Sequence, residues 1–247
     1  MRMITTVVRS PRRSEQPIFL NADHTHSLES SVEAAKAGFD AVVIDFSTLP
    51  FDENVRRTRE VVDAVRAIDR GILVEGEIGN IGSGSRIHEG AVDDRPHLTT
   101  ADEAKRFVDA TGIDVLAPAV GNRHGMVAGM VRGDTKKRLD AGRIAEIKQA
   151  AGVFLTLHGG SGTDDDDFRR AIDAGINVVH INTELRVAWR HALETSLARA
   201  PGEVVPYEIL SPVVDAVKEI VRSRLRLFGA RPPTKTRAVD EGASHPA

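Results

Sequence analysis

The sequence of 247 residues contains no cysteine. Disulfide bonds and thiolate metal sites are therefore excluded, and any bound metal must use histidine, carboxylate or carbonyl ligands. Basic residues are not in excess either, since 33 Lys and Arg stand against 36 Asp and Glu, for a formal net charge of -3. Nucleic-acid-binding proteins usually carry a basic surplus, so we expect no nucleic-acid partner.

Long apolar segments are also missing. No stretch reaches the roughly 18 consecutive apolar residues of a membrane-spanning helix, and residues 1–16 lack the apolar region of a signal peptide. We therefore expect a soluble, cytoplasmic protein with no membrane partner. The length fits one α/β barrel domain, although two small domains would also fit it.

The sequence does contain a regular alternation of short β-branched runs with longer amphipathic segments. This alternation predicts a parallel sheet covered by helices, either a barrel or a doubly wound layer. The six expected strands lie at residues 18–23, 41–47, 71–79, 114–120, 153–160 and 177–183. The expected helices lie at residues 27–39, 50–69, 99–112, 140–152, 164–175 and 211–229.

The distribution of polar residues favours the barrel. In five of the six expected strands they gather at the carboxyl end, where both architectures place active sites. No GxGxxG motif opens the first strand-helix unit, which argues against a dinucleotide-binding layer. We therefore predict an α/β, TIM-type barrel over residues 1–229, followed by a disordered tail at residues 230–247.

Three histidines, His24, His124 and His158, each lie at or just after the end of an expected strand. Three imidazoles with an open fourth position make a catalytic zinc site. Each histidine alone is more often a buried, hydrogen-bonded residue, but the shared position of all three favours the zinc site. Asp23 precedes His24 and is either an orienting or helix-capping carboxylate, or an acid or base beside a substrate oxygen.

Small residues follow two neighbouring expected strands. The stretch LHGGSG would leave the N–H groups of Gly159, Gly160 and Ser161 free to surround an anion such as phosphate. HINTEL repeats the arrangement, with Asn182 and Thr183 as donors at the start of a helix. Two such cradles at adjacent strand ends are typical of the phosphate site of βα barrels.

Carboxylates follow the second and third expected strands. Glu75 and Glu77 share one face of a strand, and Asp45 ends the strand before it. Such carboxylates need protons, cations or arginines beside them, so a second cation and a hydrogen-bonded structural network carry equal weight. The long glycine-rich loop that follows suggests a lid or a binding loop, in which His88 and Glu89 are the evident proton carriers.

Taken together, five motifs resemble the class II, zinc-dependent aldolases of fructose and tagatose bisphosphates. In order they are DHTHSLESSVEAAKAGFDAVVIDFSTLPFDENVRRT, VEGEIGNIGSGS, AVGNRHG, LHGGSG and INTEL, and the resemblance spans residues 18 to 228. It implies a TIM barrel and the reversible cleavage of a ketose 1,6-bisphosphate to dihydroxyacetone phosphate and an aldehyde. It also implies a homodimer or a larger assembly.

The resemblance implies a role for each matching residue. Zinc would be bound by His24, His124 and His158, with Asp23 as the proton donor, and a second cation by Asp45 and Glu77. The residues that match positions contacting the ketose or dihydroxyacetone phosphate are Gly125, Gly159, Gly160, Ser161, His180 and Thr183. His180 stands where better-known members have asparagine, so it either marks a different substrate or reaches the metal itself.

Two further departures leave alternatives open. Ser85 and Arg86 replace an acidic pair in the loop of better-known members, which leaves Glu89 as a weak substitute for the proton-abstracting residue. About two strands of the family's eight have no counterpart before residue 18, so the chain is a fragment, has a misassigned start, or is completed by a partner. The alternatives to an active aldolase are a metal- or sugar-phosphate-binding remnant and a metal-dependent hydrolase.

Overall fold

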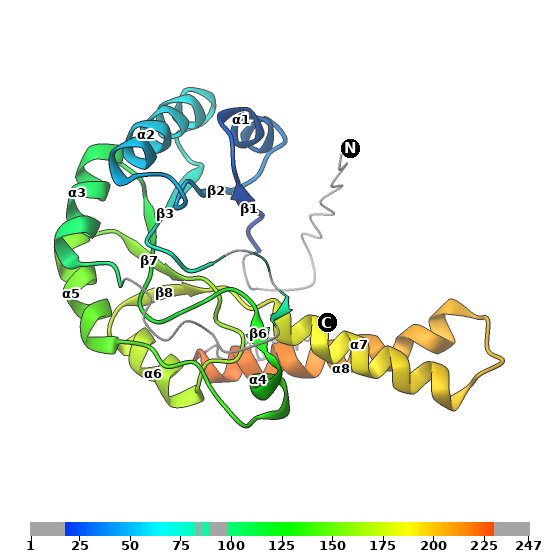
Figure 1. Cartoon of the computed structure of the whole chain (residues 1–247). Helices are drawn as coiled ribbons and strands as arrows, with labels where there is room; N and C mark the ends of the chain where they lie inside the picture. Colours follow the sequence, from blue (N-terminus) through cyan, green and yellow to red (C-terminus); the bar gives the residue numbers. More distant parts are fainter. Residues whose placement is uncertain (1–17, 83, 85, 89–97, 230–247) are drawn as a thin grey trace, which may run out of the picture.

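The computed structural model describes residues 18–82, 84, 86–88 and 98–229. These residues form a half-barrel in which six parallel strands build one curved sheet in the order β1-β2-β3-β5-β7-β8 (Figure 1). The predicted six-stranded, incomplete α/β barrel is thereby confirmed. The proposed tail at residues 230–247, the loop residue Ser85 and the candidate Glu89 lie outside the described residues.

Strands and helices alternate along the chain as expected. The strands of the main sheet are β1 (Asn21–Thr25), β2 (Ala41–Ile44), β3 (Leu73–Ile78), β5 (Val115–Pro118), β7 (Phe154–Leu157) and β8 (Ile176–Val179). A separate two-stranded sheet pairs β4 (Ile87–His88) with β6 (Met126–Val127). The helices are α1 (Leu28–Lys36), α2 (Phe51–Ile68), α3 (Ala101–Thr111), α4 (Ala128–Arg132), α5 (Ala141–Ala151), α6 (Asp165–Asp173), α7 (Thr183–Arg199) and α8 (Pro206–Leu227).

The side-chain alternation of β3 separates the hydrophobic core from the polar interior of the half-barrel. Val74 and Ile78 belong to the core, whereas Glu75 and Glu77 point to the opposite face, because successive residues of a strand alternate. Gly76 also lies on the core side, where a Cβ atom would approach Phe107 of α3 to 2.8 Å. Glycine at this position therefore lets α3 pack directly onto the strand.

The same separation holds across the sheet. Helices α2, α3, α5 and α6 cover its outer face (Figure 1). The fully buried side chains between these layers include Val61, Val65, Phe107, Ile144, Ile147, Leu155, Leu157 and Phe168. On β7, Leu155 and Leu157 face this core, so Thr156 and the following His158 are directed to the polar interior.

The last helix differs from the expected one at its start. Helix α8 begins at Pro206 rather than at residue 211, and Pro212 lies inside it. Pro206 fits the first helical position, where its missing N–H leaves no bond unmade. The first turn is also held to α7, because the hydroxyl of Ser196 donates to the carbonyl of Ile209 at 2.8 Å.

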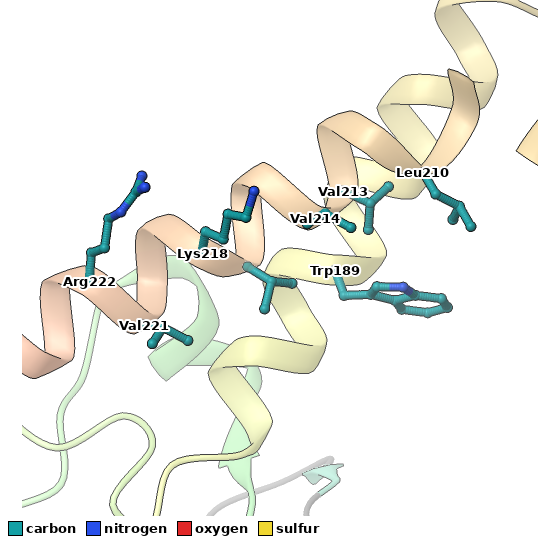
Figure 2. A pocket seen from close by; sticks show the side chains of 8 residues that line it. Trp189, Leu210, Val213, Val214, Lys218, Val221 and Arg222 are labelled. Atoms are coloured by element: carbon teal, nitrogen blue, oxygen red, sulfur yellow. The ribbon is translucent and has the colours of Figure 1, made fainter. Parts of the chain in front are cut away.

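Helices α7 and α8 pack as an antiparallel hairpin that extends away from the sheet (Figure 1). A groove of about 460 Å³ runs along it and is lined by apolar residues such as Trp189, Leu210 and Val214, with Lys218 and Arg222 at one side (Figure 2). Among the described residues, no helix is both long enough and apolar enough to cross a membrane.

Candidate metal centre and anion-binding loops

The three predicted histidine ligands lie together at the carboxyl ends of their strands. His24 belongs to β1, His124 follows β5, and His158 follows β7. The ring centroid of His24 lies 4.8 Å from that of His124 and 4.7 Å from that of His158. The centroids of His124 and His158 are 5.6 Å apart. Residues far apart in the sequence thus meet because parallel strands end at one edge of the sheet.

Glu77 completes a group of four residues that could hold a metal ion. One ligand atom from each of His24, Glu77, His124 and His158 lies within 4.8 Å of the others. In the described part of the chain, Nε2 of His24, Oε2 of Glu77, Nε2 of His124 and Nδ1 of His158 are buried without a hydrogen-bond partner. Unpaired buried polar atoms are costly, and three imidazoles with a carboxylate are ligands that zinc accepts, so these residues fit a zinc ion.

A local distortion of β1 brings Asp23 and His24 to the same place. His24 has a φ of 53°, in the left-handed region, and the pairing of β1 with β2 shifts register between Ala22 and Thr25. In a regular strand these two neighbours would point to opposite faces. Here Oδ1 of Asp23 lies 3.7 Å from Nε2 of His24.

Two further carboxylates, Glu75 and Asp45, contact the ring nitrogens of His158 and His24 that are not in the group of unpartnered atoms. Nε2 of His158 lies 2.5 Å from Oε1 of Glu75, whose other oxygen accepts a hydrogen bond from the hydroxyl of Thr156 at 2.8 Å. Nδ1 of His24 lies 3.2 Å from Oδ2 of Asp45, and Oδ1 of the same carboxylate accepts hydrogen bonds from the N–H and the hydroxyl of Ser47. A carboxylate on one ring nitrogen fixes the ring and leaves the other nitrogen to a metal.

Burial and neighbouring charges shift the pKa values of this group. Burial raises the pKa of Glu77 to about 8, and the nearby charge of Asp45 adds to the shift. Burial and the charge of His24 lower the pKa of His124 to about 4. Burial would lower the pKa of His24 as well, but its bond to Asp45 and the charges of Asp23 and Glu77 raise it overall.

His180 extends the centre on the side of Asp23. Its ring centroid lies 4.3 Å from that of His158, and its Nδ1 lies 3.4 Å from Oδ1 of Asp23. Asp23, His158 and His180 form a second group whose ligand atoms lie within 4.8 Å of one another. Burial would raise the pKa of Asp23, but the bond to His180 and the charges of His180 and His24 lower it to about 2. Asp23 is therefore held ionised at neutral pH.

The predicted anion-binding residues lie beside this centre, in the loops after β5 and β7 and at the start of α7. The N–H of Gly160 is not free as expected, because it donates to the carbonyl of His180 at 3.2 Å. The hydroxyl oxygen of Ser161 accepts hydrogen bonds from the N–H groups of Asn182 and Glu184, which ties the loop to the start of α7.

Other donors of these loops have no partner within the part of the chain that the structure describes. For the N–H groups of Gly125, Gly159, Ser161 and Thr183, we find no acceptor among the described residues. Gly159 has a φ of 61°, and a Cβ atom there would lie 2.3 Å from the carbonyl of Arg123. Only glycine allows the two loops to approach so closely.

Two residues of this region have roles that sequence reasoning missed. The sequence predicts Glu75 only as one of two carboxylates on a strand face, although Thr156 and His158, which share one face of their strand, are a signal for a polar partner in the interior. Lys137 donates from its ammonium group to carbonyls of both glycine loops. It lies between expected elements in the sequence, and no motif there pointed to it.

Comparison with known proteins gives the same family that the five motifs suggested. The model of the family described as fructose-bisphosphate aldolase class-II matches residues 1–232. The fructose-bisphosphate aldolase of Geobacillus stearothermophilus is 36% identical over 216 residues, which are 87% of this chain and 71% of that protein. The fructose-bisphosphate aldolase of Thermus caldophilus is 34% identical over 246 residues, covering 91% of this chain and 78% of that protein.

Solved structures agree. A putative fructose-1,6-bisphosphate aldolase from Coccidioides immitis superposes with a TM-score of 0.71 at 32% identity, over 89% of this chain and 74% of that one. The YdjI aldolase from Escherichia coli K12 gives a TM-score of 0.69 at 31% identity, over 87% of this chain and 70% of that one. The chain thus belongs to the class II fructose-bisphosphate aldolase family.

Proposed function

We propose that this protein is a zinc-dependent aldolase that reversibly cleaves a ketose 1,6-bisphosphate, of the fructose or tagatose type, to dihydroxyacetone phosphate and an aldehyde. The observation that carries the proposal is the set of four buried, unpartnered ligand atoms on His24, Glu77, His124 and His158, with the Asp23 carboxylate beside them. The names of the relatives support the substrate class.

His24, Glu77, His124 and His158 would hold a zinc ion, which would supply a Lewis acid for the ketone of the substrate. In the cleavage direction, the C4 hydroxyl must lose a proton as the C3–C4 bond breaks, and C3, which keeps the electron pair of that bond, must gain a proton to give dihydroxyacetone phosphate. Asp23 is the proposed base for this proton, since its low pKa keeps it ionised and it is half-exposed to the space above the centre. In the reverse direction the same carboxyl returns the proton, and His180 holds its Oδ1 from the side.

Substrate phosphate is assigned to the glycine loops, whose unpaired N–H groups at Gly125, Gly159, Ser161 and Thr183 can donate to its oxygens. Asn182, at the start of α7, is proposed to lie beside the ketose. A second cation between Asp45 and Glu77 is a further proposal, supported by the approach of both carboxylates to Nδ1 of His24 at 3.2 and 4.0 Å.

The test is the release of dihydroxyacetone phosphate from fructose and tagatose 1,6-bisphosphates, with added zinc and with a chelator. We expect cleavage that the chelator abolishes. His158→Ala should lose both zinc and activity, because it removes a ligand, whereas His191→Ala on the exposed face of α7 should retain both. Stoichiometric zinc in His158→Ala would contradict the proposed ligand set.

Zinc and dihydroxyacetone phosphate binding without cleavage would instead favour a binding protein that has lost the chemistry. Hydrolysis without carbon–carbon cleavage would favour a metal-dependent hydrolase.

A homodimer or larger assembly is also proposed for this chain. The apolar groove on α7 and α8, with Val214 50% and Trp189 45% exposed, supports self-association along the hairpin. Sedimentation equilibrium of the purified chain tests it, and a monomer at micromolar concentration would contradict it.

A further inference from the structure

Lys137 is a buried lysine whose ammonium group contacts four backbone carbonyl oxygens. Its side chain reaches the loops after β5 and β7 at once. Nζ lies 2.6 Å from the carbonyl oxygens of Arg123, Gly125 and Ser161, and 2.8 Å from that of Gly159. The residue is only 6% exposed, so these contacts replace water.

Four acceptors exceed the three N–H bonds that an ammonium group can offer. The surroundings of Nζ are therefore those of a small monovalent cation coordinated by carbonyl dipoles, as in a potassium filter, rather than those of an ordinary lysine hydrogen bond. Without a positive charge, the negative ends of four converging carbonyl dipoles would repel one another in a water-poor site. The two loops need a cation at this point.

No carboxylate among the described residues forms an ion pair with Lys137, although the charge of Glu184 favours its protonated form. Glu184 is itself bound by Arg224, which donates to both of its carboxylate oxygens at 2.7 Å. Burial lowers the pKa of Lys137 to about 7. The positive charge that Lys137 carries when protonated has no carboxylate bound directly to it among these residues, and an anion bound nearby would stabilise that charged form.

The contacts also orient the loops. In a planar peptide the carbonyl and the following N–H point in opposite directions, so carbonyls directed at Lys137 turn the next N–H groups away from it. Three of the four following N–H groups, those of His124, Met126 and Gly160, are bound to the carbonyls of Ile81, Arg86 and His180 at 2.8, 2.9 and 3.2 Å. Both loops are therefore fixed on each side, which holds the neighbouring unpaired N–H groups in place.

The backbone of Lys137 is anchored as well. Its N–H donates to the carbonyl of Gly162 at 2.9 Å, and its carbonyl accepts from the N–H of Asp164 at 3.3 Å. The backbone of Lys137 is thus bound to residues 162 and 164, which follow the second glycine loop, and its side chain contacts the carbonyls of Gly159 and Ser161 in that loop.

We propose that Lys137 is a positioning residue that acts as a built-in monovalent cation: it joins the two glycine loops and supplies positive charge to a bound phosphate group. The proposal rests on the aldolase function proposed above, because the phosphate belongs to the ketose bisphosphate and to dihydroxyacetone phosphate. Lys137 touches no reacting atom and acts through the loops.

Lys137→Met tests the proposal, since methionine fills similar space without charge. We expect the KM for the bisphosphate to rise about 10- to 100-fold, the size expected for losing charge-assisted hydrogen bonds, while bound zinc and kcat change much less. Lys136→Met is the matched control, because Lys136 is exposed, and it should leave KM unchanged. An unchanged KM in folded, zinc-loaded Lys137→Met would overturn the proposal.

Lys137→Ala provides a rescue experiment. The emptied cage should accept ammonium or potassium, so either salt should lower the KM of this variant, whereas choline chloride, whose cation is too large, should not. The wild-type protein should respond to none of the three salts. Equal responses of Lys137→Ala to all three would count against the cage.

A measurement on the wild-type protein needs no variant to fold. The 15N resonance of the Lys137 ammonium should shift when inorganic phosphate is added to zinc-loaded protein, and a resonance that does not move at saturating phosphate would overturn the proposal. If phosphate moves the resonance but the wild-type protein cleaves no bisphosphate, the proposed function fails while the role of Lys137 in anion binding stands.

Discussion

Glu75 illustrates how a single residue can control a metal ligand without touching the metal. Its Oε1 lies 2.5 Å from Nε2 of His158, and this contact directs the other ring nitrogen, Nδ1, toward the centre. Thr156 in turn holds Glu75 through a 2.8 Å hydrogen bond. Both residues are buried, so water cannot replace either contact.

Glu75→Gln should weaken zinc binding about 10- to 100-fold, the range expected for a partner of a metal-binding histidine. The amide is neutral, so it no longer stabilises positive charge on His158 when a metal withdraws electrons from the ring. Competition with a zinc-sensitive dye measures the affinity. Glu60→Gln, at an exposed position of α2, is the control, and equal affinities of the two variants would show that Glu75 does not support the ligand.

At the scale of an element, the packing of helix α3 on strand β3 supports the carboxylates of the centre. One face of β3 presents Glu75 and Glu77 to the centre, while Gly76 on the other face receives the ring of Phe107. The position of both carboxylates therefore depends on how closely α3 packs against the strand.

Gly76→Ala should lower the free energy of unfolding by about 1–3 kcal/mol, the usual cost of overpacking a core. The added methyl group would meet Cε1 of Phe107 at 2.8 Å and Cδ1 of Ile113 at 3.3 Å, and both belong to fully packed side chains. Urea unfolding followed by circular dichroism measures the change. Gly202→Ala, whose added Cβ would meet no heavy atom of the described residues within 4 Å, is the control, and equal midpoints would disprove the packing argument.

At the scale of the whole molecule, metal binding is coupled to protonation. Glu77 has a pKa of about 8, so in the metal-free protein it holds a proton at pH 7, and the pKa of His24 is raised above its usual value. His124, with a pKa of about 4, is already neutral there. Zinc ligands must be deprotonated, so binding at pH 7 releases the proton of Glu77, and the raised pKa of His24 adds to proton release as the pH is lowered.

Zinc affinity should therefore fall as the pH is lowered from 8 toward 6, and fewer protons should be released at pH 9 than at pH 7. Isothermal titration calorimetry in buffers of different ionisation enthalpy counts these protons. A proton count that is the same at both pH values would contradict the shifted pKa values. Because zinc binds the folded state, the melting temperature should also rise with zinc more at pH 8 than at pH 6.

The three histidines could be predicted from the sequence because their approach depends on topology alone. Parallel strands end at one edge, so His24, His124 and His158 had to lie near one another once the alternation of strands and helices was recognised. The six strands of the main sheet were predictable for the same reason. Their sequences carry the alternation and the β-branched residues that strands require.

Other contacts could not be predicted, because they depend on local backbone geometry. The shared location of Asp23 and His24 requires the left-handed residue in β1, which no strand pattern indicates. The N–H of Gly160 was expected to be free, but it donates to the carbonyl of His180, the residue that directly follows β8. Lys137 reaches acceptors 12 to 24 residues away along the chain, a separation that no local motif reports.

The left-handed backbone at His24 also limits how the centre could be redesigned for another metal. Among residues that offer a ligand atom, aspartate and asparagine accept a positive φ more readily than cysteine or glutamate. Oxygen ligands at residue 24 would favour harder cations such as magnesium or manganese, whereas a thiolate, which softer metals prefer, would need the strand to rearrange. The left-handed residue in β1 thus disfavours a cysteine ligand at position 24 of the metal centre.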